Sequence, residues 1–591
     1  MKKTLSVIIS FLMLLGICSL IPVIYAADDP ADPIAVSDAA GFAAMDQTGS
    51  YYLTADITLS ETFVGTFAGI LDGKGHTITV SAPIFENVKG TVKNLTVSGE
   101  IKSSAEILAA VAVNAAEGSK FENITNTANV IGDAKATKRA GAIFGLATSG
   151  SVRVEVINCK NSGNINAYVA GGIAGRAEND ILVSGCVNTG KITGGDTLSG
   201  ILAWPVETFT VENCINGTEG CGAIIGDTGD SSGGIISYIS ENSSGTVTGC
   251  VNYSDIYNTG RCAAGIISRL GKNSSATFVD CRNYGNMTNT NASYACGGIA
   301  GESGGSVFFK NCVNYGNVKA EGNKAGGIAG YLDGITECER CINYGDIAAA
   351  KQAGGLIAHC GNNKVDSGDY IFKYCGNEGN VTATASTASG LVAYCFGNAS
   401  HAPKIVGCYS IGNISGGEET CGIIGYVNNA PQLSVRNCFV SGKLATTGSG
   451  YKTCALFFSN FSESVDMSGV SGNYYTADSA ECERYDKKEY VPSASNLTDA
   501  DLSSGKLAYE LNSALGENVF FQTLGEDMHP TLDSTRKTVL LDNGKYVNEK
   551  QTDDPAPSTG DSHIIILLAS AFTVFCGIAL WYKKTKLQPE D

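Results

Sequence analysis

The feature that most constrains this chain is a unit of about 30 residues that recurs through its middle. The clearest copies read Asn-Cys-x-Asn-x-Gly-x-Ile or Val, as at 158–165 and 311–318, and a Gly-Gly-Ile or Gly-Gly-Leu follows, as at 171–173. A unit of this length cannot bury its apolar face alone, so successive units must stack to form a core. The chain is therefore predicted to fold as a solenoid.

The cysteine of this pattern gives the size of each coil. Two earlier units, at 94–97 and 123–126, match the pattern without the cysteine. Together the units predict about twelve coils. The equivalent cysteines, 27 to 36 residues apart, are Cys159, Cys186, Cys214, Cys250, Cys281, Cys312, Cys341, Cys375, Cys408 and Cys438.

The residues between the glycines favour strands. Apolar residues alternate over short runs, as at 276–279 and 306–309, and glycine interrupts each run before a helix could extend. The runs are rich in Val, Ile, Phe, Tyr and Thr, and Asn-x-Gly supplies corners where a left-handed backbone costs little. We predict an all-β parallel β-helix over residues 51–460, with two or three short strands per coil.

The ten equivalent cysteines would lie above one another as an internal ladder. Cysteine is among the most buried residue types and packs as a small apolar side chain, which favours a role as core filler. Disulfides between neighbouring coils are the second interpretation, although parallel side chains suit the disulfide dihedral poorly. A metal site is the third, but only Cys338 and Cys341 form a C-x-x-C pair, and no second pair follows at zinc spacing. We predict no metal and no cofactor.

Two further residue types recur in register with the cysteines. Tyrosine follows the cysteine by three residues in four successive coils, at Tyr253, Tyr284, Tyr315 and Tyr344. Stacking would align these rings into a strip that joins a flat apolar ring to a hydroxyl and suits sugar or protein contacts; alternatively, the stacking only stabilises the turn. Asparagine follows by two residues and is predicted to satisfy backbone groups of the turns, at Asn161, Asn188, Asn216, Asn252, Asn283, Asn314, Asn343 and Asn377.

The N-terminus has the three parts of a secretory signal peptide. Lys2 and Lys3 precede an apolar run from Leu5 to Ile24, and small residues lead to an acidic start at Asp28. We predict a signal peptide over 1–26, cleaved after Ala26, and a lead-in segment over 27–50; cleavage after Ala27 and a permanent N-terminal anchor are the alternatives.

The C-terminus carries a second apolar segment. Residues 563–582 are long enough to cross a bilayer as a transmembrane helix, and the lysines of the tail 583–591 place that tail in the cytoplasm. The linker 548–562 before it contains the sequence Ala556, Pro557, Ser558, Thr559 and Gly560.

This order resembles the cell-wall sorting signal of Gram-positive surface proteins, whose usual pentapeptide is Leu-Pro-x-Thr-Gly. Pro557, Thr559 and Gly560 match that pentapeptide, whereas Ala556 stands in place of the leucine. The resemblance implies a sortase and peptidoglycan as partners and a location at the surface of a Gram-positive bacterium. Without sorting, the protein would remain a single-pass membrane protein.

The repeats resemble a known family. The segment Leu-Asp-Gly-Lys-Gly-His-Thr-Ile at 71–78 resembles the opening coils of pectate-lyase-like β-helix proteins. Ala-Gly-Gly-Ile-Ala-Gly at 170–175 and 325–330 is similar to the GLUG motif of bacterial adhesins and of some immunoglobulin A peptidases. The resemblance covers about residues 50 to 460 and concerns architecture, because a fold does not determine an activity.

After the repeats, residues 461–547 are predicted to form a small α+β capping unit. Residues 498–512 read as one helix, with Thr498 as its N-cap and Leu502, Leu507 and Leu511 on one face. The residues after this helix are expected to cover the open end of the solenoid core, because terminal units of solenoids need capping.

The composition excludes several functions. The net charge of −18 and the lack of a basic cluster before the tail exclude nucleic acid as a partner. A zinc peptidase would need His-Glu-x-x-His, and none of the five histidines has a second histidine four positions later. Acidic residues within the repeats are sparse and do not cluster at equivalent positions of adjacent coils. The sequence therefore predicts a non-enzymatic, adhesin-like rod that binds a glycan or protein; the alternative is a β-helix polysaccharide lyase or glycoside hydrolase.

Overall fold

The computed structural model describes residues 32–133, 135–218, 224–226, 229–361, 369–397, 402–428, 432–449, 453–459, 467–476, 482–486 and 494–549. Within these ranges, no helix has both the length and the apolar character needed to cross a bilayer. The predicted signal peptide, the sorting motif 556–560 and the apolar segment 563–582 lie outside them.

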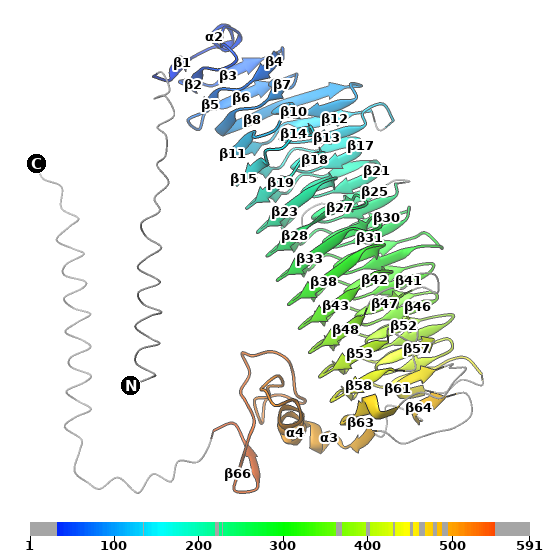
Figure 1. The fold of residues 1–591 in the computed structure, drawn as a ribbon. Coiled ribbons are helices and arrows are strands. Elements are labelled where there is room, and N and C mark those ends of the chain that lie inside the picture. The colour runs from blue at the N-terminus through cyan, green and yellow to red at the C-terminus, as the bar shows by residue number, and fades with distance from the viewer. Residues whose placement is uncertain are drawn as a thin grey trace, which may run out of the picture.

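The described chain forms a long stack of parallel strands (Figure 1). Eleven successive parallel pairings join twelve strands, one per coil, and so bound eleven turns. The prediction of a parallel β-solenoid is confirmed. These strands are β8 (Thr91–Ser103), β11 (Lys120–Asn126), β15 (Val154–Ile157), β19 (Ile181–Ser184), β23 (Thr208–Glu212), β28 (Ser244–Thr248), β33 (Ser275–Val279), β38 (Ser306–Lys310), β43 (Thr336–Glu339), β48 (Tyr370–Lys373), β53 (Pro403–Val406) and β58 (Ser434–Arg436).

The stack starts with shorter turns. β1 (Ile34–Val36) pairs in parallel with β2 (Ser50–Leu53), and β2 pairs with β5 (Ile70–Asp72). The predicted lead-in 27–50 thus already contributes a strand to the stack. It also contains the short helix α2 (Ala39–Ala43), whose Phe42 ring lies 5.7 Å from the Phe85 ring and covers the apolar interior at this end.

A typical coil holds five short strands, more than the two or three predicted. One coil consists of β33, β34 (Arg282–Asn283), β35 (Met287–Asn289), β36 (Ala295–Gly297) and β37 (Ala300–Ser303). Each pairs in register with its counterpart in the next coil. The short strands escaped prediction because two-residue strands such as β34 are too short to show an alternating pattern.

The left-handed turn of each coil lies at the residue before the ladder cysteine, or before the residue that takes its place (Leu95, Ile124 and Asn473), not within Asn-x-Gly as predicted. This residue has φ between 52° and 66° in thirteen successive coils. Asparagine or glycine fills most of these positions because both tolerate a left-handed backbone at low cost. This requirement explains the Asn-Cys pair of the repeat. The thirteen residues are Asn94, Asn123, Asn158, Gly185, Asn213, Gly249, Asp280, Asn311, Arg340, Tyr374, Gly407, Asn437 and Gly472.

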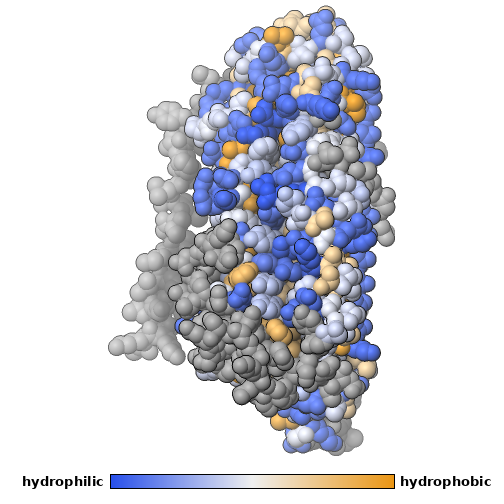
Figure 2. Space-filling model, turned by 90° about the vertical axis from the view of Figure 1, so that its right-hand side faces the viewer, coloured by the Kyte–Doolittle hydropathy of each residue, from blue (hydrophilic) through white to orange (hydrophobic). Residues whose placement is uncertain are grey.

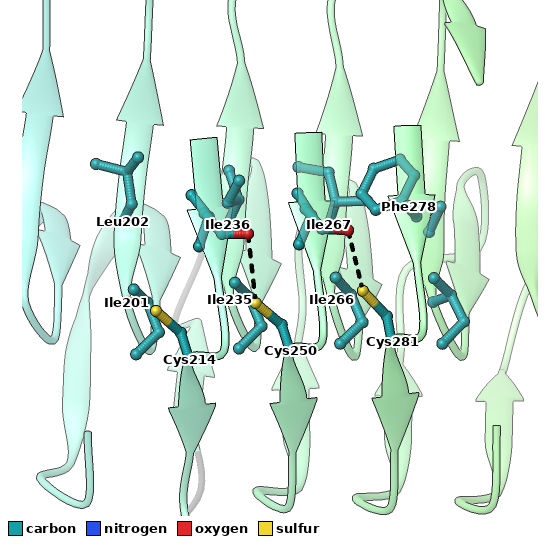
Figure 3. Close-up of a cluster of buried hydrophobic side chains, with 14 of the residues drawn as sticks. Ile201, Leu202, Cys214, Ile235, Ile236, Cys250, Ile266, Ile267, Phe278 and Cys281 are labelled. Atoms are coloured by element: carbon teal, nitrogen blue, oxygen red, sulfur yellow. Dashed lines mark hydrogen bonds between the residues drawn. The ribbon is translucent and has the colours of Figure 1, made fainter. Parts of the chain in front are cut away.

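The ladder cysteines line the core as predicted. The seventeen cysteines whose side chains the structure describes are buried and carry free thiols. Figure 3 shows Cys214, Cys250 and Cys281 in a row beside the isoleucines of the facing strands. The thiol of Cys281 donates to the carbonyl oxygen of Val247 in the preceding coil, at 3.4 Å, and Cys250 makes the same contact with Val211, at 3.7 Å. A thiol in this position therefore fills the core and satisfies a backbone acceptor at once.

The C-terminal unit differs from its prediction in two ways. Residues 498–512 form two helices, α3 (Asp499–Ser503) and α4 (Lys506–Leu515), because Gly505 between them has a φ of 84°. Thr498 caps α3 as predicted, and Asp501 completes a capping box with it.

The second difference is the position of this unit, which packs beside the last coils (Figure 1). Leu507 and Leu511 of α4 and the nearby Phe520 pack against Tyr409 and Phe439, which point outward from successive coils. The unit was expected to cover the open end of the core. It covers an outer flank instead, because these rings would be an exposed apolar surface without it, and both are fully buried beneath it.

Candidate ligand-binding surfaces

The four predicted tyrosines form a continuous outer strip, which we call the tyrosine strip. The ring centroids of Tyr253 and Tyr284 lie 4.9 Å apart, those of Tyr284 and Tyr315 4.6 Å, and those of Tyr315 and Tyr344 5.1 Å. The interplanar angles are 4° to 11°. Each side chain is 37% to 41% exposed. The spacing follows the distance between paired strands of neighbouring coils.

This stacking decides which part of each ring meets a ligand. Because neighbouring rings cover one another's faces, the inner tyrosines, Tyr284 and Tyr315, present their edges and hydroxyl groups to solvent. The pKa of Tyr284 is raised by burial and by the neighbouring tyrosines, so its hydroxyl stays protonated and can donate a hydrogen bond. The strip is therefore a row of hydroxyls on an apolar base.

The tyrosine strip ends at the C-terminal unit. In the next coil its position is taken by Glu378, which accepts a hydrogen bond from the Tyr409 hydroxyl at 2.6 Å. Burial, and next the charge of Glu378, raise the pKa of Tyr344. Beyond this point the flank is covered: Tyr374 donates to Glu517, and Tyr409 packs against Phe520. The tyrosine strip is thus the uncovered part of this flank of the solenoid, whose last coils are covered by the C-terminal unit.

The asparagine series serves the turns, as predicted. Each buried amide donates from its Nδ2 to the Oδ1 of the equivalent asparagine one coil on, at 2.7 to 2.9 Å from Asn126 to Asn377. The Nδ2 of Asn314 also donates to the carbonyl oxygen of Gly316, at 2.7 Å. These amides bind the coils together below the surface and offer nothing to a ligand.

A second row of side chains, which we call the mixed row, was missed by sequence reasoning. Its members stand at one position of successive coils, three residues after a core isoleucine or leucine, and that fixed spacing was the signal that could have revealed them. Because the residues at this position differ in type, the repeat is not apparent from residue identity. They are Arg176, Trp204, Tyr238, Arg269, Glu302, Tyr331, His359, Tyr394 and Tyr426.

Rings and guanidinium groups stack along the mixed row. The Arg176 guanidinium lies 4.2 Å from the centroid of Trp204, and Arg269 lies 4.9 Å from that of Tyr238. The indole Nε1 of Trp204 donates to Ser240 Oγ at 2.7 Å. Such contacts stabilise neighbouring coils as well as offering planar groups to a ligand.

Ion pairs hold the charged members of the mixed row. The Nε of Arg261 donates to Glu302 Oε2 at 2.7 Å, and Arg269 Nη1 lies 2.6 Å from Asp230 Oδ2. Burial by itself would raise the pKa of Glu302, but Arg261 outweighs burial and holds that pKa below its usual value. A carboxylate held ionised by a guanidinium is poorly suited to general acid catalysis.

His359 is the buried member of the mixed row. Its Nδ1 lies 2.9 Å from Gln352 Oε1 and its Nε2 lies 3.0 Å from the carbonyl oxygen of Gly361. Burial, and next the charge of Lys324, lower the pKa of His359 to about 3. The imidazole is therefore neutral in the folded protein across the physiological range.

This buried histidine makes stability depend on pH. In the unfolded chain the His359 imidazole binds a proton near pH 6.5, whereas in the folded protein it binds one only near pH 3. The contribution of His359 to the free energy of unfolding is therefore complete above pH 6.5 and decreases as the pH falls below it. We expect His359→Gln to reduce the pH dependence of the free energy of unfolding by up to about 1.4 kcal/mol per pH unit between pH 6 and 4. Urea midpoints measured at several pH values test it, with His76→Gln, at a partly exposed histidine, as control. Equal pH slopes for His359→Gln and the unchanged protein would contradict the assignment.

A cavity of about 610 Å³ lies at the N-terminal end of the stack. Phe42, Met45 and Phe63 form part of its apolar wall, and Asp46 is among its acidic residues. The Asp46 carboxylate accepts hydrogen bonds from the backbone of Thr48, at 2.8 Å, and of Gly49, at 2.6 Å. The Asp46 carboxylate therefore stabilises the turn formed by the residues that follow it.

Figure 2 shows one long face of the rod, where hydrophilic residues predominate and apolar residues are scattered singly. Such scattered residues are normal for a soluble surface and do not mark a docking patch.

Comparisons with known proteins do not assign a family. No family model matches the chain, and no curated protein matches it. A solved structure named "putative immunoglobulin A1 protease from Bacteroides ovatus" aligns with 52% of this chain and 84% of its own, at 17% identity and a TM-score of 0.29. A similarity this distant carries no argument about function.

Proposed function

We propose that this protein is a non-enzymatic, adhesin-like surface rod that binds a glycan or protein ligand through the tyrosine strip. The observation that carries the proposal is the unbroken row of four stacked rings, each about 40% exposed. Fixed aromatic rings lose little conformational freedom on binding, and tyrosine is enriched among residues that dominate binding energy.

The strip needs neighbouring residues to reach the size of a stable interface, which is about 800 Å² per partner. Val251 and Val313 are half-buried and Arg282 is exposed, and all three lie two residues before a strip tyrosine. Together they give a surface with apolar, hydroxyl and cationic groups. That mixture suits a ligand with hydrogen-bond acceptors.

A β-helix polysaccharide lyase or glycoside hydrolase is the less supported candidate. Hydrolysis needs a pair of carboxyl groups, one of which donates a proton. The buried carboxylate of the mixed row, Glu302, is committed to Arg261. The ion pair favours a structural role for this carboxylate.

Replacing two strip residues tests the binding function. We expect Tyr284→Ala with Tyr315→Ala to weaken ligand binding at least about tenfold while changing the melting temperature little, because tyrosine edges at an interface centre contribute more than 1 kcal/mol each. A glycan array probed with fragment 28–550, run beside an assay for polysaccharide depolymerisation, identifies the ligand and the class of activity.

The control for this pair is Tyr257→Ala, at a tyrosine that is also 40% exposed but lies outside the strip. Its binding should match that of the unchanged protein. Release of oligosaccharide product would instead support the enzyme, and a large loss of stability with binding intact would return the tyrosines to a structural role.

The proposal includes export and covalent anchoring. The signal peptide 1–26, cleaved after Ala26, supplies export, and the motif 556–560 supplies the sortase site. Pro555 and Pro557 disfavour helix, so the peptide would stay extended and accessible to the sortase cysteine. Attack on the carbonyl carbon of Thr559 releases Gly560 onward, and a cell-wall amine then takes the acyl group.

We therefore expect the mature protein to end at Thr559, amide-linked to peptidoglycan, and to start at Ala27. Mass spectrometry of muramidase-released protein measures both ends. Thr559→Ala should leave the tail attached and the protein extractable by detergent. Recovery of the intact segment 560–591 on the unchanged protein would leave a single-pass membrane protein instead.

A further inference from the structure

Two buried cysteines outside the ladder lie opposite each other in neighbouring coils. Cys360 lies at the end of β47 (Ile357–Cys360), and Cys395 lies in β52 (Val392–Phe396) of the next coil. The two strands pair in parallel with Cys360 directly opposite Cys395. The Sγ atoms are 3.1 Å apart, and both side chains are fully buried.

The ladder thiols provide the contrast. Cys281 and Cys312 lie in neighbouring coils too, but each thiol donates to a carbonyl oxygen of the preceding coil, at 3.4 and 3.5 Å. The Cys360 thiol is directed at a second thiol instead. Neighbouring paired strands lie about 4.8 Å apart, within the Cα range that a disulfide spans. The close approach of the two sulfurs places Cys360 and Cys395 where a disulfide requires only a small further movement of the side chains.

From this geometry we propose that Cys360 and Cys395 form a disulfide that staples two neighbouring coils. The bond is a modification of the exported protein, since oxidising conditions outside the cytoplasm favour disulfides. Its formation is independent of the ligand proposed for the tyrosine strip.

The chemistry requires a small-molecule disulfide as oxidant. The Cys395 thiolate attacks one sulfur of this oxidant, forms a mixed disulfide and releases a thiolate. The Cys360 thiolate then attacks the Cys395 sulfur of the mixed disulfide and releases the second thiolate. The two protein thiols lose two protons and two electrons, and the oxidant is reduced to two thiols. Because both sulfurs are buried in the finished fold, the exchange takes place before the coils close over them.

The test uses the full chain purified without reductant. The protein is denatured, alkylated without reduction, digested and examined by mass spectrometry. We expect one cross-linked pair of peptides joining Cys360 to Cys395, lighter by two hydrogens than the two free peptides, while Cys281 and Cys312 are recovered alkylated. Protein refolded with oxidised glutathione should give the same pair.

Variants separate this bond from others. Cys360→Ser should leave Cys395 alkylated and unpaired. Reductant should lower the melting temperature of the unchanged protein by roughly 2–6 °C, because the closed loop restricts the unfolded chain, and should leave Cys360→Ser with Cys395→Ser unaffected. Recovery of both cysteines alkylated after oxidative refolding, or linkage of Cys360 to any other cysteine, would overturn the proposal.

Discussion

Replacing Asn314 by alanine is expected to lower the free energy of unfolding by about 3–5 kcal/mol. The Nδ2 of Asn314 donates to Asn343 Oδ1 and to the Gly316 carbonyl oxygen, both at 2.7 Å, and its Oδ1 accepts from Asn283 at 2.8 Å. Truncation leaves Asn343 Oδ1 and the Gly316 carbonyl oxygen without this donor and Asn283 Nδ2 without its acceptor, in a site that is fully buried. Each such loss costs about 1–3 kcal/mol.

Asn314→Asp provides a sharper version of the same test. The shape is kept, but an ionised carboxylate cannot donate to Asn343 or Gly316, so we expect a loss at least as large at neutral pH. Protonation restores one donor, and the midpoint of urea unfolding should recover part of the loss below about pH 5. The matched control is Asn317→Ala, at an exposed asparagine that accepts from the Asp346 backbone at 2.9 Å. A loss at Asn314 no greater than at Asn317 would refute the role of the buried row.

Removing Arg261 is the second change with a large expected effect. Arg261→Ala should cost about 3–5 kcal/mol, because it leaves Glu302 as a buried charge without its bidentate partner. The side chain of Glu302 is only 16% exposed, so solvent cannot replace the guanidinium. Urea or thermal unfolding of the purified variant measures the loss.

Double replacement separates the cost of the unpaired charge from the value of the pair. Arg261→Met with Glu302→Met should recover most of the stability, because well-packed apolar residues replace buried ion pairs at little cost. Lys319→Ala, which breaks the exposed pair with Glu321, is the control and should change stability by less than about 1 kcal/mol. A double variant as unstable as Arg261→Ala would show that the residues act through packing alone.

Sequence periodicity was sufficient for the architecture and for three of the repeated series of side chains. Cys281, Asn283 and Tyr284 recur with the period of the coil, and residues one period apart must meet when coils stack in register. The mixed row has the same period, but its members range from Trp204 to Glu302, so identity of residue type gives no sign of it. Its signal in the sequence is the fixed spacing of three residues after a core isoleucine or leucine, and the strand pairing shows that these positions lie in register.

The C-terminal unit shows a different limit of sequence reasoning. Thr498 predicts the start of a helix because its side chain can cap the first turn, and the capping box that it forms with Asp501 confirms this start. Gly505 divides the predicted helix in two because its backbone is left-handed. The sequence does not reveal this break, because a glycine inside a helical pattern is often tolerated. Where the unit packs depends on Tyr409 and Phe439, which lie 60 residues or more before α3 and α4 in the sequence.

In-register stacking gives this molecule a simple way to grow. A tandem duplication of the 31 residues from Cys281 to Asn311 would enter as one additional coil, whose asparagine, cysteine and tyrosine meet the same neighbours as the originals. Each such event lengthens the molecule by about 4.8 Å and adds one ring to the strip. Reach and the number of contact sites therefore rise together under a single genetic change, without any redesign of the ends.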